Sequence, residues 1–238
     1  MGNFKGLLAS DFFMLAENRF MNSRSFYESK KDEIKEKIII PLRALASDVN
    51  EYMLKVDAEM FANPTRQLSR VFRDSRRSSD KTLYRENLWI GFSRNKKEFE
   101  LYPSFWFEVF QDGYTYGVGF FYSTPALMEC YRNEILKNTA KFSRMVKGFE
   151  SEGFSTYGEC YKRPKEGKIP KSIYEYYNKK NIGVFKSGGN IDDLADENFS
   201  QKLIENYKKL APMYRLLLSA SLSERQRQIE EKESVINA

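Results

Sequence analysis

The sequence predicts an α+β fold in which N-terminal, middle and C-terminal helices pack on an antiparallel β-sheet. Apolar residues recur at helical spacing near both ends of the chain, whereas residues 68 to 122 alternate in the manner of strands. The chain has 238 residues, of which 41% are hydrophobic, so it is long enough to bury a sizeable core. We therefore expect one domain over residues 1–220, followed by a polar C-terminal extension, helical or frayed, over residues 221–238.

Amphipathic helices are predicted before the sheet. Ser10 is a favourable N-cap for a short helix that ends near Asn18. Residues 22–61 repeat apolar side chains at steps of three and four, which predicts one long helix or two, with a kink or break at Pro41 because proline lacks a backbone N–H. The apolar positions of these helices are Phe12, Phe13, Leu15, Ala16, Phe26, Ile34, Ile38, Leu42, Leu45 and Val49.

Strand-like segments rich in β-branched and aromatic residues follow these helices. We expect them to form an antiparallel meander, to which residues 156–162 could add a further strand. The four segments are residues 68–74, 88–94, 104–111 and 114–122.

The last two of these segments are joined by Asp112-Gly113, which predicts a two-residue type I′ turn because both central residues of that turn need positive φ. In the resulting register Phe110 faces Thr115. One face of the hairpin then carries Trp106, Glu108, Phe110, Thr115, Gly117, Gly119 and Phe121, and the other carries Phe107, Val109, Tyr116, Val118 and Phe120.

The glycines of this hairpin predict a shallow hollow, since Gly117 and Gly119 would lie opposite Glu108 and Trp106. Two interpretations are open. An aromatic ring could lie over the glycines and fill the hollow, or the hollow could admit a ligand beside Glu108.

Helical spacing returns over residues 123–150, with Ser123 or Thr124 as N-cap and Pro125 in the first turn. A short helix is predicted from Ser172, and an amphipathic helix closes the domain over residues 192–220. The expected buried positions of the middle helix are Leu127, Tyr131, Ile135 and Leu136.

Several classes of function are excluded by composition. Histidine is absent, which rules out Ser-His-Asp and Cys-His catalysis. Cys130 and Cys160 have no further cysteine or histidine partners, so we expect no metal and no cofactor. Spacing leaves a disulfide between them open, although two cysteines in a chain of this size favour reduced thiols. Since no apolar run reaches bilayer length and no signal peptide is visible, we expect a cytoplasmic protein without a membrane partner.

Basic residues are concentrated in two regions of a chain whose net charge is +6. Residues 66–85 carry seven basic and two acidic side chains, and residues 137–186 carry twelve basic and five acidic ones. Such regional charge favours an anionic partner, although a solvated lysine-rich face would give the same composition.

Two short motifs stand out against this background. The first is NSRSFYESKK at residues 22–31, which falls on the pattern N-N-x-x-W-F-x-x-x-K, and the second is RDSRRSSDKTLY at residues 73–84, which falls on R-D-x-R-F-S-x-D-K-x-P-Y. In this order they resemble the motifs of the bacterial and fungal family filed as domain of unknown function 2461. The matching residues are Asn22, Arg24, Phe26, Tyr27, Lys31, Arg73, Asp74, Arg76, Ser78, Asp80, Lys81 and Tyr84.

The resemblance covers residues 11 to about 220 and includes a glycine-rich strand, a helix bearing Arg132 and the loop YKRP at residues 161–164. Two positions of the second motif depart from the family pattern, because Arg77 replaces a phenylalanine and Leu83 replaces a proline. The family has no assigned activity, so the resemblance implies membership but no reaction.

The basic stretch RVFRDSRRSSDKTLY, residues 70–84, is the candidate functional segment, and two interpretations of it are open. Its aspartates could pair with neighbouring cations in a structural network, or its cations could bind an anion. In the second case the ligand-binding residues would be Arg73, Arg76, Lys81 and Arg132. Asp80, Glu108 and Tyr84 would orient the ligand or move protons, as candidate catalytic residues.

These observations favour a protein that binds an anionic small molecule, bearing phosphate or carboxylate, through an Arg/Lys-rich cleft. An enzyme that acts on a phosphorylated substrate with Asp or Glu as acid-base is an alternative, and it would require a shifted pKa of Asp80 or Glu108. Nucleic-acid binding is a further alternative that no sequence motif supports. The sequence leaves the oligomeric state open.

Overall fold

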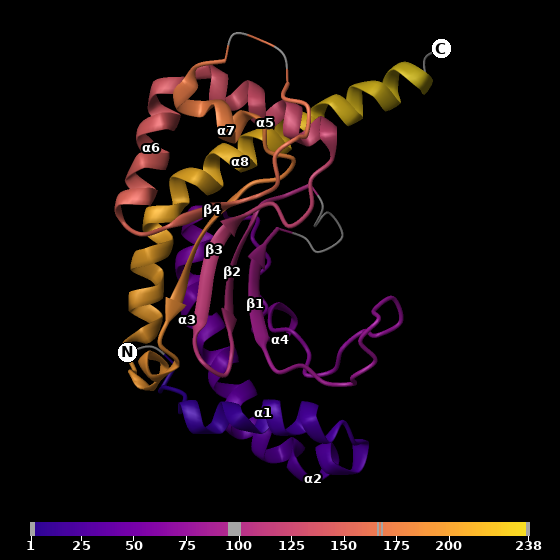
Figure 1. Ribbon diagram of the computed structural model, residues 1–238, viewed down its shortest axis with the longest axis vertical. Coiled ribbons are helices and arrows are strands. Elements are labelled where there is room, and N and C mark those ends of the chain that lie inside the picture. The colour runs from indigo at the N-terminus through magenta and orange to yellow at the C-terminus, as the bar shows by residue number, and fades with distance from the viewer. Residues whose placement is uncertain (1–2, 95–100, 166, 168, 237–238) are drawn as a thin grey trace. The chain divides into compact units, whose positions relative to one another are not determined.

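The structure is a computed structural model that describes residues 3–94, 101–165, 167 and 169–236, and it contains a five-stranded antiparallel sheet and helices (Figure 1). The strand order is β1-β2-β3-β5-β4, so the two last strands of the chain extend the sheet beyond β3. The α+β prediction is confirmed. The strands are β1 Leu88–Ser93, β2 Ser104–Val109, β3 Tyr114–Gly119, β4 Ser155–Tyr157 and β5 Gly183–Gly189.

The chain divides into two compact units. The first comprises the described residues of Met1–Phe92, Trp106–Tyr116 and Ser187–Lys208, and the second comprises those of Ser93–Phe105, Gly117–Lys186 and Lys209–Ala238. The division passes through β2, β3 and β5. The single domain over residues 1–220 stays a prediction.

In the first unit, the N-terminal helix begins earlier and ends later than predicted. The helix α1 spans Ala9–Met21, so Ser10 is not its N-cap; that position belongs to Leu8, which offers no side-chain hydrogen bond. The helix continues past Asn18 because Asn22 provides the left-handed C-cap conformation, with φ of 45°, that asparagine tolerates better than most residues.

A π-helical turn, η1 Lys35–Ile39, connects α2 Arg24–Ile34 to α3 Ile40–Val56. Pro41 lacks an N–H, and its ring crowds the carbonyl four residues earlier, so a regular α-helical ladder cannot pass through this point. The N–H of Ile40 accordingly bonds to the carbonyl of Lys35, one residue further back than in an α-helix. The interruption predicted at Pro41 is therefore a widened turn in a continuous helical path.

The buried faces of these helices largely follow the predicted periodicity. Phe13 is an exception, since 51% of its surface is exposed, and the fully buried Asn18 lies on the inner face of α1 instead. The predicted apolar positions that are buried are Phe12, Leu15, Ile34, Ile38, Leu42, Leu45 and Val49.

The β2–β3 hairpin has the predicted faces but not the predicted turn. Gly113 lacks a positive φ, so the turn is not type I′. The N–H of Phe110 donates to the carbonyl of Gly113, at 2.7 Å, and Phe110 therefore pairs with Gly113 rather than with Thr115. This displaces each cross-strand partner by two residues, which leaves the faces unchanged. The buried residues of the inner face are Phe107, Val109, Tyr116, Val118 and Phe120.

Gly113 is required for a different reason. A Cβ at this position would lie 2.4 Å from the carbonyl oxygen of Gly189, so the glycine permits close approach of two backbone segments.

In the second unit, the hollow predicted at Gly119 is filled by an aromatic ring. The ring belongs to Tyr157 of β4, whose hydroxyl donates to the carbonyl of Phe120 at 2.9 Å. The interpretation that an aromatic ring fills the hollow therefore holds at Gly119, although the ring is not that of Trp106.

The middle helix is split into α5 Pro125–Lys137 and α6 Thr139–Ser151. Thr124 caps α5 by accepting from the N–H of Leu127, and Asn138 caps α6 by accepting from the N–H of Lys141, which explains the break. Leu127, Tyr131 and Ile135 are buried as predicted, whereas Leu136 is 41% exposed, which contradicts the prediction.

Short helices and one long helix complete the chain. The long helix reaches into the predicted polar extension, which is therefore helical in its described part. In the described parts of the chain, no helix combines the length and the apolar character needed to cross a membrane. These helices are α4 Pro64–Gln67, η3 Lys171–Ile173, α7 Tyr174–Tyr177, η4 Ile191–Ala195 and α8 Phe199–Ile236.

The close packing at Gly119 predicts that Gly119→Ala destabilises the protein. A Cβ there would lie 2.5 Å from the Cα of Gly183, which is backbone and cannot rotate away. We expect a loss of about 1–3 kcal/mol in the free energy of unfolding, measured by urea denaturation. Gly91→Ala is the matched strand control, because nothing lies within 4 Å of its Cβ, and it should change stability by less than about 0.5 kcal/mol. Equal losses in both variants would contradict the packing argument.

Candidate functional site

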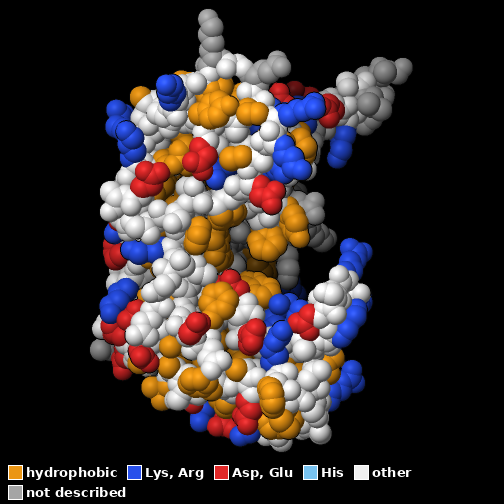
Figure 2. Space-filling model, viewed as in Figure 1, with side chains coloured by type: hydrophobic (Ala, Val, Ile, Leu, Met, Phe, Trp, Pro, Cys, Tyr) orange, Lys and Arg blue, Asp and Glu red, His pale blue; other side chains and the backbone are white. Residues whose placement is uncertain are grey.

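The basic stretch forms a loop of two antiparallel arms in the first unit. Bridges join Leu68 to Ile90 and Phe72 to Tyr84, and the N–H of Arg73 donates to a carbonyl of the opposite arm at 2.8 Å. The prediction of a continuous strand over residues 68–74 is therefore wrong, because this segment pairs only through isolated bridges at Leu68 and Phe72. Figure 2 shows Lys and Arg side chains gathered over this loop.

The carboxylate of Asp80 is clamped by two arginines. It accepts hydrogen bonds from Arg73 of the loop and from Arg19 of α1, the latter at 2.8 Å, and its second oxygen accepts from the N–H of Thr82 at 2.9 Å. The bond from Thr82 and the guanidinium of Arg73 lower the pKa of Asp80. Asp80 is therefore an anion near neutral pH, and it is poorly suited to donate a proton.

The tip of the loop has its own partners. Arg76 pairs with Asp74 at 2.6 Å, and 86% of its side chain is exposed. The ammonium of Lys81 donates to the carbonyl of Ser75 at 3.0 Å. Arg73, Arg76 and Lys81 thus bond to the protein's own acceptors, and their ligand-binding role stays a prediction.

Glu108 lies on β2 and is half-buried. Burial raises the pKa of its carboxyl group, and this effect is opposed by a hydrogen bond from Asn87 and by the charge of Arg85. Arg85 stacks over the ring of Trp89, with its guanidinium carbon 4.3 Å from the ring centroid. Glu108 therefore has a raised pKa, and its nearest polar partners are Asn87 and Arg85, which follow the second arm of the loop.

The two sequence motifs pack against each other. Asn22 of the first motif accepts from the N–H of Leu83 in the second at 2.8 Å. Tyr27 stacks on Tyr84, with ring centroids 5.2 Å apart, and Phe72 contacts both rings. Tyr84 is fully buried and burial raises the pKa of its hydroxyl, so the structure gives it a packing role rather than access to a ligand.

Arg132 belongs to the second unit, whereas the other predicted site residues belong to the first. It lies on α5 and is only 4% exposed. Its guanidinium carbon lies about 6 Å from the rings of Tyr161 and Tyr177, both in the second unit.

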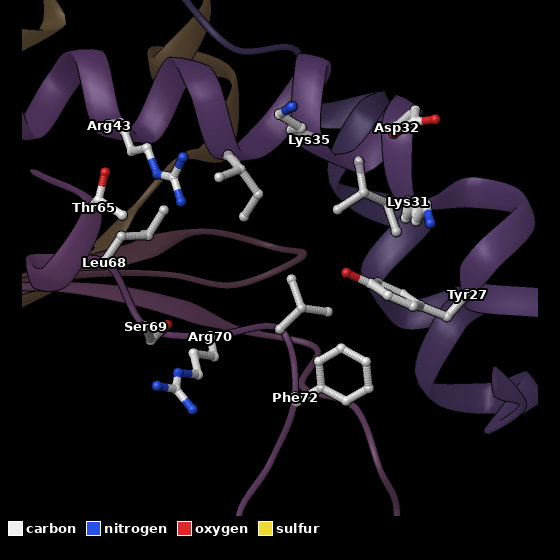
Figure 3. Close-up of a pocket in the computed structure, with 13 residues that line it drawn as sticks. Tyr27, Lys31, Asp32, Lys35, Arg43, Thr65, Leu68, Ser69, Arg70 and Phe72 are labelled. Carbon is white, nitrogen blue, oxygen red and sulfur yellow. The ribbon is translucent and has the colours of Figure 1, made fainter.

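A pocket of about 360 Å³ lies in the first unit, between the helical path α2–η1–α3 and the first arm of the loop (Figure 3). The opening residues of the basic stretch, Arg70, Val71 and Phe72, form part of its wall. The other lining residues are Tyr27, Lys31, Asp32, Ile34, Lys35, Ile39, Arg43, Thr65, Leu68 and Ser69.

Four cationic side chains and one carboxylate line this pocket. Lys31 is paired with Glu28 at 2.5 Å, whereas Lys35, Arg43 and Arg70 form no ion pair within the described part of the chain. The Nε atom of Arg43 is buried and has no hydrogen-bond partner among the described residues.

The polar groups of the pocket are not all aimed inward. In Figure 3 the guanidinium of Arg43 and the hydroxyl of Tyr27 point into the pocket, while the carboxylate of Asp32 points away from it. Burial and the nearby charge of Glu28 raise the pKa of Tyr27, so its hydroxyl remains a donor. The guanidinium of Arg70 also points away from the pocket, so the donors that face it are those of Arg43 and Tyr27.

Most residues of this pocket do not stand out in the sequence. Tyr27 and Lys31 were visible as motif residues, but Lys35 and Arg43 occupy ordinary polar positions beside an apolar stripe. The one available signal was Pro41, since a proline inside a helical pattern can mark a π-helical turn, and Lys35 and Arg43 lie on either side of it.

Comparisons with known proteins identify the family of this chain but no individual relative. A family model described as a conserved hypothetical protein (DUF2461) matches residues 10–216. No curated protein matches the chain. Across the residues that the structure describes, no three Cys, Asp or Glu side chains are grouped so that they could hold a metal ion.

The Asp80 clamp predicts a pH-dependent contribution to stability. The pKa of Asp80 is lower in the folded than in the unfolded state, so its contribution is full above the unfolded value, about 3.9, and is lost as the pH falls toward the folded value. Asp80→Asn should lower the Tm at pH 7, and the difference from wild type should shrink below about pH 4.

Asp74→Asn is the control for this prediction, because it removes an ion pair from the same loop. Its pair with Arg76 is largely exposed, so we expect little change in Tm. A larger effect for Asp74→Asn than for Asp80→Asn would contradict the assignment of Asp80 as the anchor.

Proposed function

The chain belongs to the DUF2461 family of conserved hypothetical proteins, and we propose that it binds an anionic small molecule in the pocket of its first unit. The observation that carries this proposal is the inward-pointing guanidinium of Arg43, whose buried Nε has no partner among the described residues. A buried N–H donor without an acceptor is costly, and a bound oxyanion would supply the acceptor.

The charge of the pocket supports the same ligand class. Arg43, Lys35 and Arg70 come from α3, η1 and the loop, and none of them forms an ion pair within the described part of the chain. Guanidinium groups form paired hydrogen bonds with carboxylate or phosphate, and such charge-assisted bonds are worth about 1.5–3 kcal/mol each. Phosphate and carboxylate are therefore the groups that this pocket suits.

The remaining wall suggests that the ligand also has an apolar part. Ile34, Ile39, Leu68, Val71 and Phe72 line the pocket beside the cations. A volume of about 360 Å³ falls in the range of small-molecule sites, which combine apolar walls with a few polar groups. We propose an amphipathic ligand with one anionic end.

The acid-base alternative has less support. The lowered pKa of Asp80 removes it as a proton donor near neutral pH, and Tyr84 is fully buried. Asp80, Glu108 and Tyr84 are all absent from the lining of the pocket. Nucleic-acid binding stays a prediction, and its steep dependence on salt would distinguish it from binding of a small anion.

In a thermal-shift screen we expect some phosphorylated or carboxylated metabolites to raise the Tm, and their uncharged analogues to leave it unchanged. For such a ligand, Arg43→Gln should weaken binding by roughly 10- to 100-fold, measured by calorimetric titration, because one charge-assisted contact is lost. Arg70→Gln should weaken it less, since Arg70 is exposed.

Arg77→Gln is the matched control. Arg77 is exposed, lies in the same loop as Arg70 and does not line the pocket. Its replacement removes one positive charge from outside the pocket, so the affinity for the ligand should be unchanged. The proposal fails if affinity falls equally in Arg77→Gln and Arg43→Gln, or if no anion in the screen binds the wild-type protein.

A further inference from the structure

We propose a second anion site, in the second unit, in which the guanidinium of Arg132 and the ammonium of Lys165 bind a compact oxyanion. The ligand group is a phosphate or a carboxylate. This site goes beyond the function proposed above, since it shares no residue with the pocket of the first unit.

The first observation is the burial of an uncompensated cation. Arg132 is 4% exposed, and its side chain makes no hydrogen bond or ion pair with any residue that the structure describes. Its Nη1 atom is buried without a partner. Buried charges are normally paired, because their removal from water is costly. Arg132 therefore marks a position where a counter-ion is expected.

The second observation is the arrangement of aromatic rings. The guanidinium carbon of Arg132 lies 6.0 Å from the ring centroid of Tyr161 and 5.8 Å from that of Tyr177. Ring faces attract the positive charge but accept none of the in-plane N–H groups. These N–H groups form the fork that suits the two oxygens of a carboxylate or phosphate.

A second cation meets the same ring. The Nζ atom of Lys165 lies 5.0 Å from the ring centroid of Tyr161, and Lys165 is exposed. In the proposed site the two cations that contact this ring share one anion, which offsets their mutual repulsion. Because Lys165 is exposed and Arg132 is buried, Lys165 would face the solvent side of the bound anion.

The loop that carries these groups is held in place by Asn178, which is 3% exposed. Its backbone carbonyl accepts from the N–H of Tyr161 at 2.9 Å, and its side-chain oxygen accepts from the N–H of Lys165 at 2.7 Å. Its own amide donates to the carbonyl of Tyr174 at 2.9 Å. These bonds fix the backbone at Tyr161 and Lys165, so less backbone freedom is lost when a ligand binds.

The test uses the whole 238-residue chain carrying Arg43→Gln, so that the contribution of the pocket in the first unit is reduced. Inorganic phosphate and acetate are titrated separately, with sodium chloride at equal ionic strength as reference, and the Tm is recorded. We expect at least one oxyanion to raise the Tm beyond the chloride reference. A larger effect of phosphate would identify a phosphate site, and a larger effect of acetate would identify a carboxylate site.

Adding Arg132→Gln or Lys165→Gln should then reduce the apparent affinity for that oxyanion by about tenfold or more. Lys147→Gln, an exposed cation of α6 in the same unit, should leave it unchanged. Without oxyanion, Arg132→Gln should have a Tm equal to or above that of its parent, because it removes an uncompensated buried charge. A purely structural arginine would instead lower the Tm.

The proposal is overturned if neither oxyanion exceeds the chloride reference, or if the oxyanion effect survives both substitutions. Should Arg132→Gln fail to fold, Lys165→Gln decides the outcome, since Lys165 is exposed and its loss should not affect folding.

Discussion

The ion pairs of Asp80 fix the conformation of the basic loop, and the pocket of the first unit depends on that conformation because residues of the loop line it. Arg19 reaches Asp80 from α1 and Arg73 reaches it from the first arm of the loop. Next to Arg73, Phe72 contacts Tyr27 of α2, so the arm lies along the helices. Arg70 and Phe72 thereby line a pocket whose opposite wall is helical. The carboxylate of Asp80 thus positions the loop, and the cations that do not bond to Asp80 remain available for a ligand.

Arginines in this protein are of two kinds, distinguished by whether a carboxylate compensates their charge. Arg73 and Arg76 form ion pairs with acidic side chains of the loop, so each already has a counter-ion within the protein. Arg43, Arg85 and Arg132 keep buried donors without an acceptor among the described residues, and of these Arg85 stacks on Trp89 and lies near Glu108. Because orphaned buried donors are rare in folded proteins, they are better indicators of a ligand than the density of charge along the sequence.

Much of the fold could be predicted, because the periodicity of apolar residues depends on local geometry. The faces of α3 and of the β2–β3 hairpin agree with the predictions, and the family membership inferred from two motifs is confirmed. The turn at Gly113 was predicted wrongly, since the glycine serves contact with Gly189, which lies far away in the sequence. The pocket was missed for the same reason, because its four cations come from α2, η1, α3 and the loop.

The sequence by itself determined the α+β class, the family and the stretch around which the first unit is organised. Local spacing and residue chemistry suffice for these conclusions, since helices and strands bury faces of fixed period. Tertiary structure alone decided which cations are compensated. The carboxylate of Asp80 could have paired with any neighbouring arginine, and only the approach of α1 brings Arg19 to it. Likewise, the burial of Arg132 without an acid depends on which side chains surround it after folding. Charge compensation is a property of distances in space, and no spacing along the chain encodes those distances.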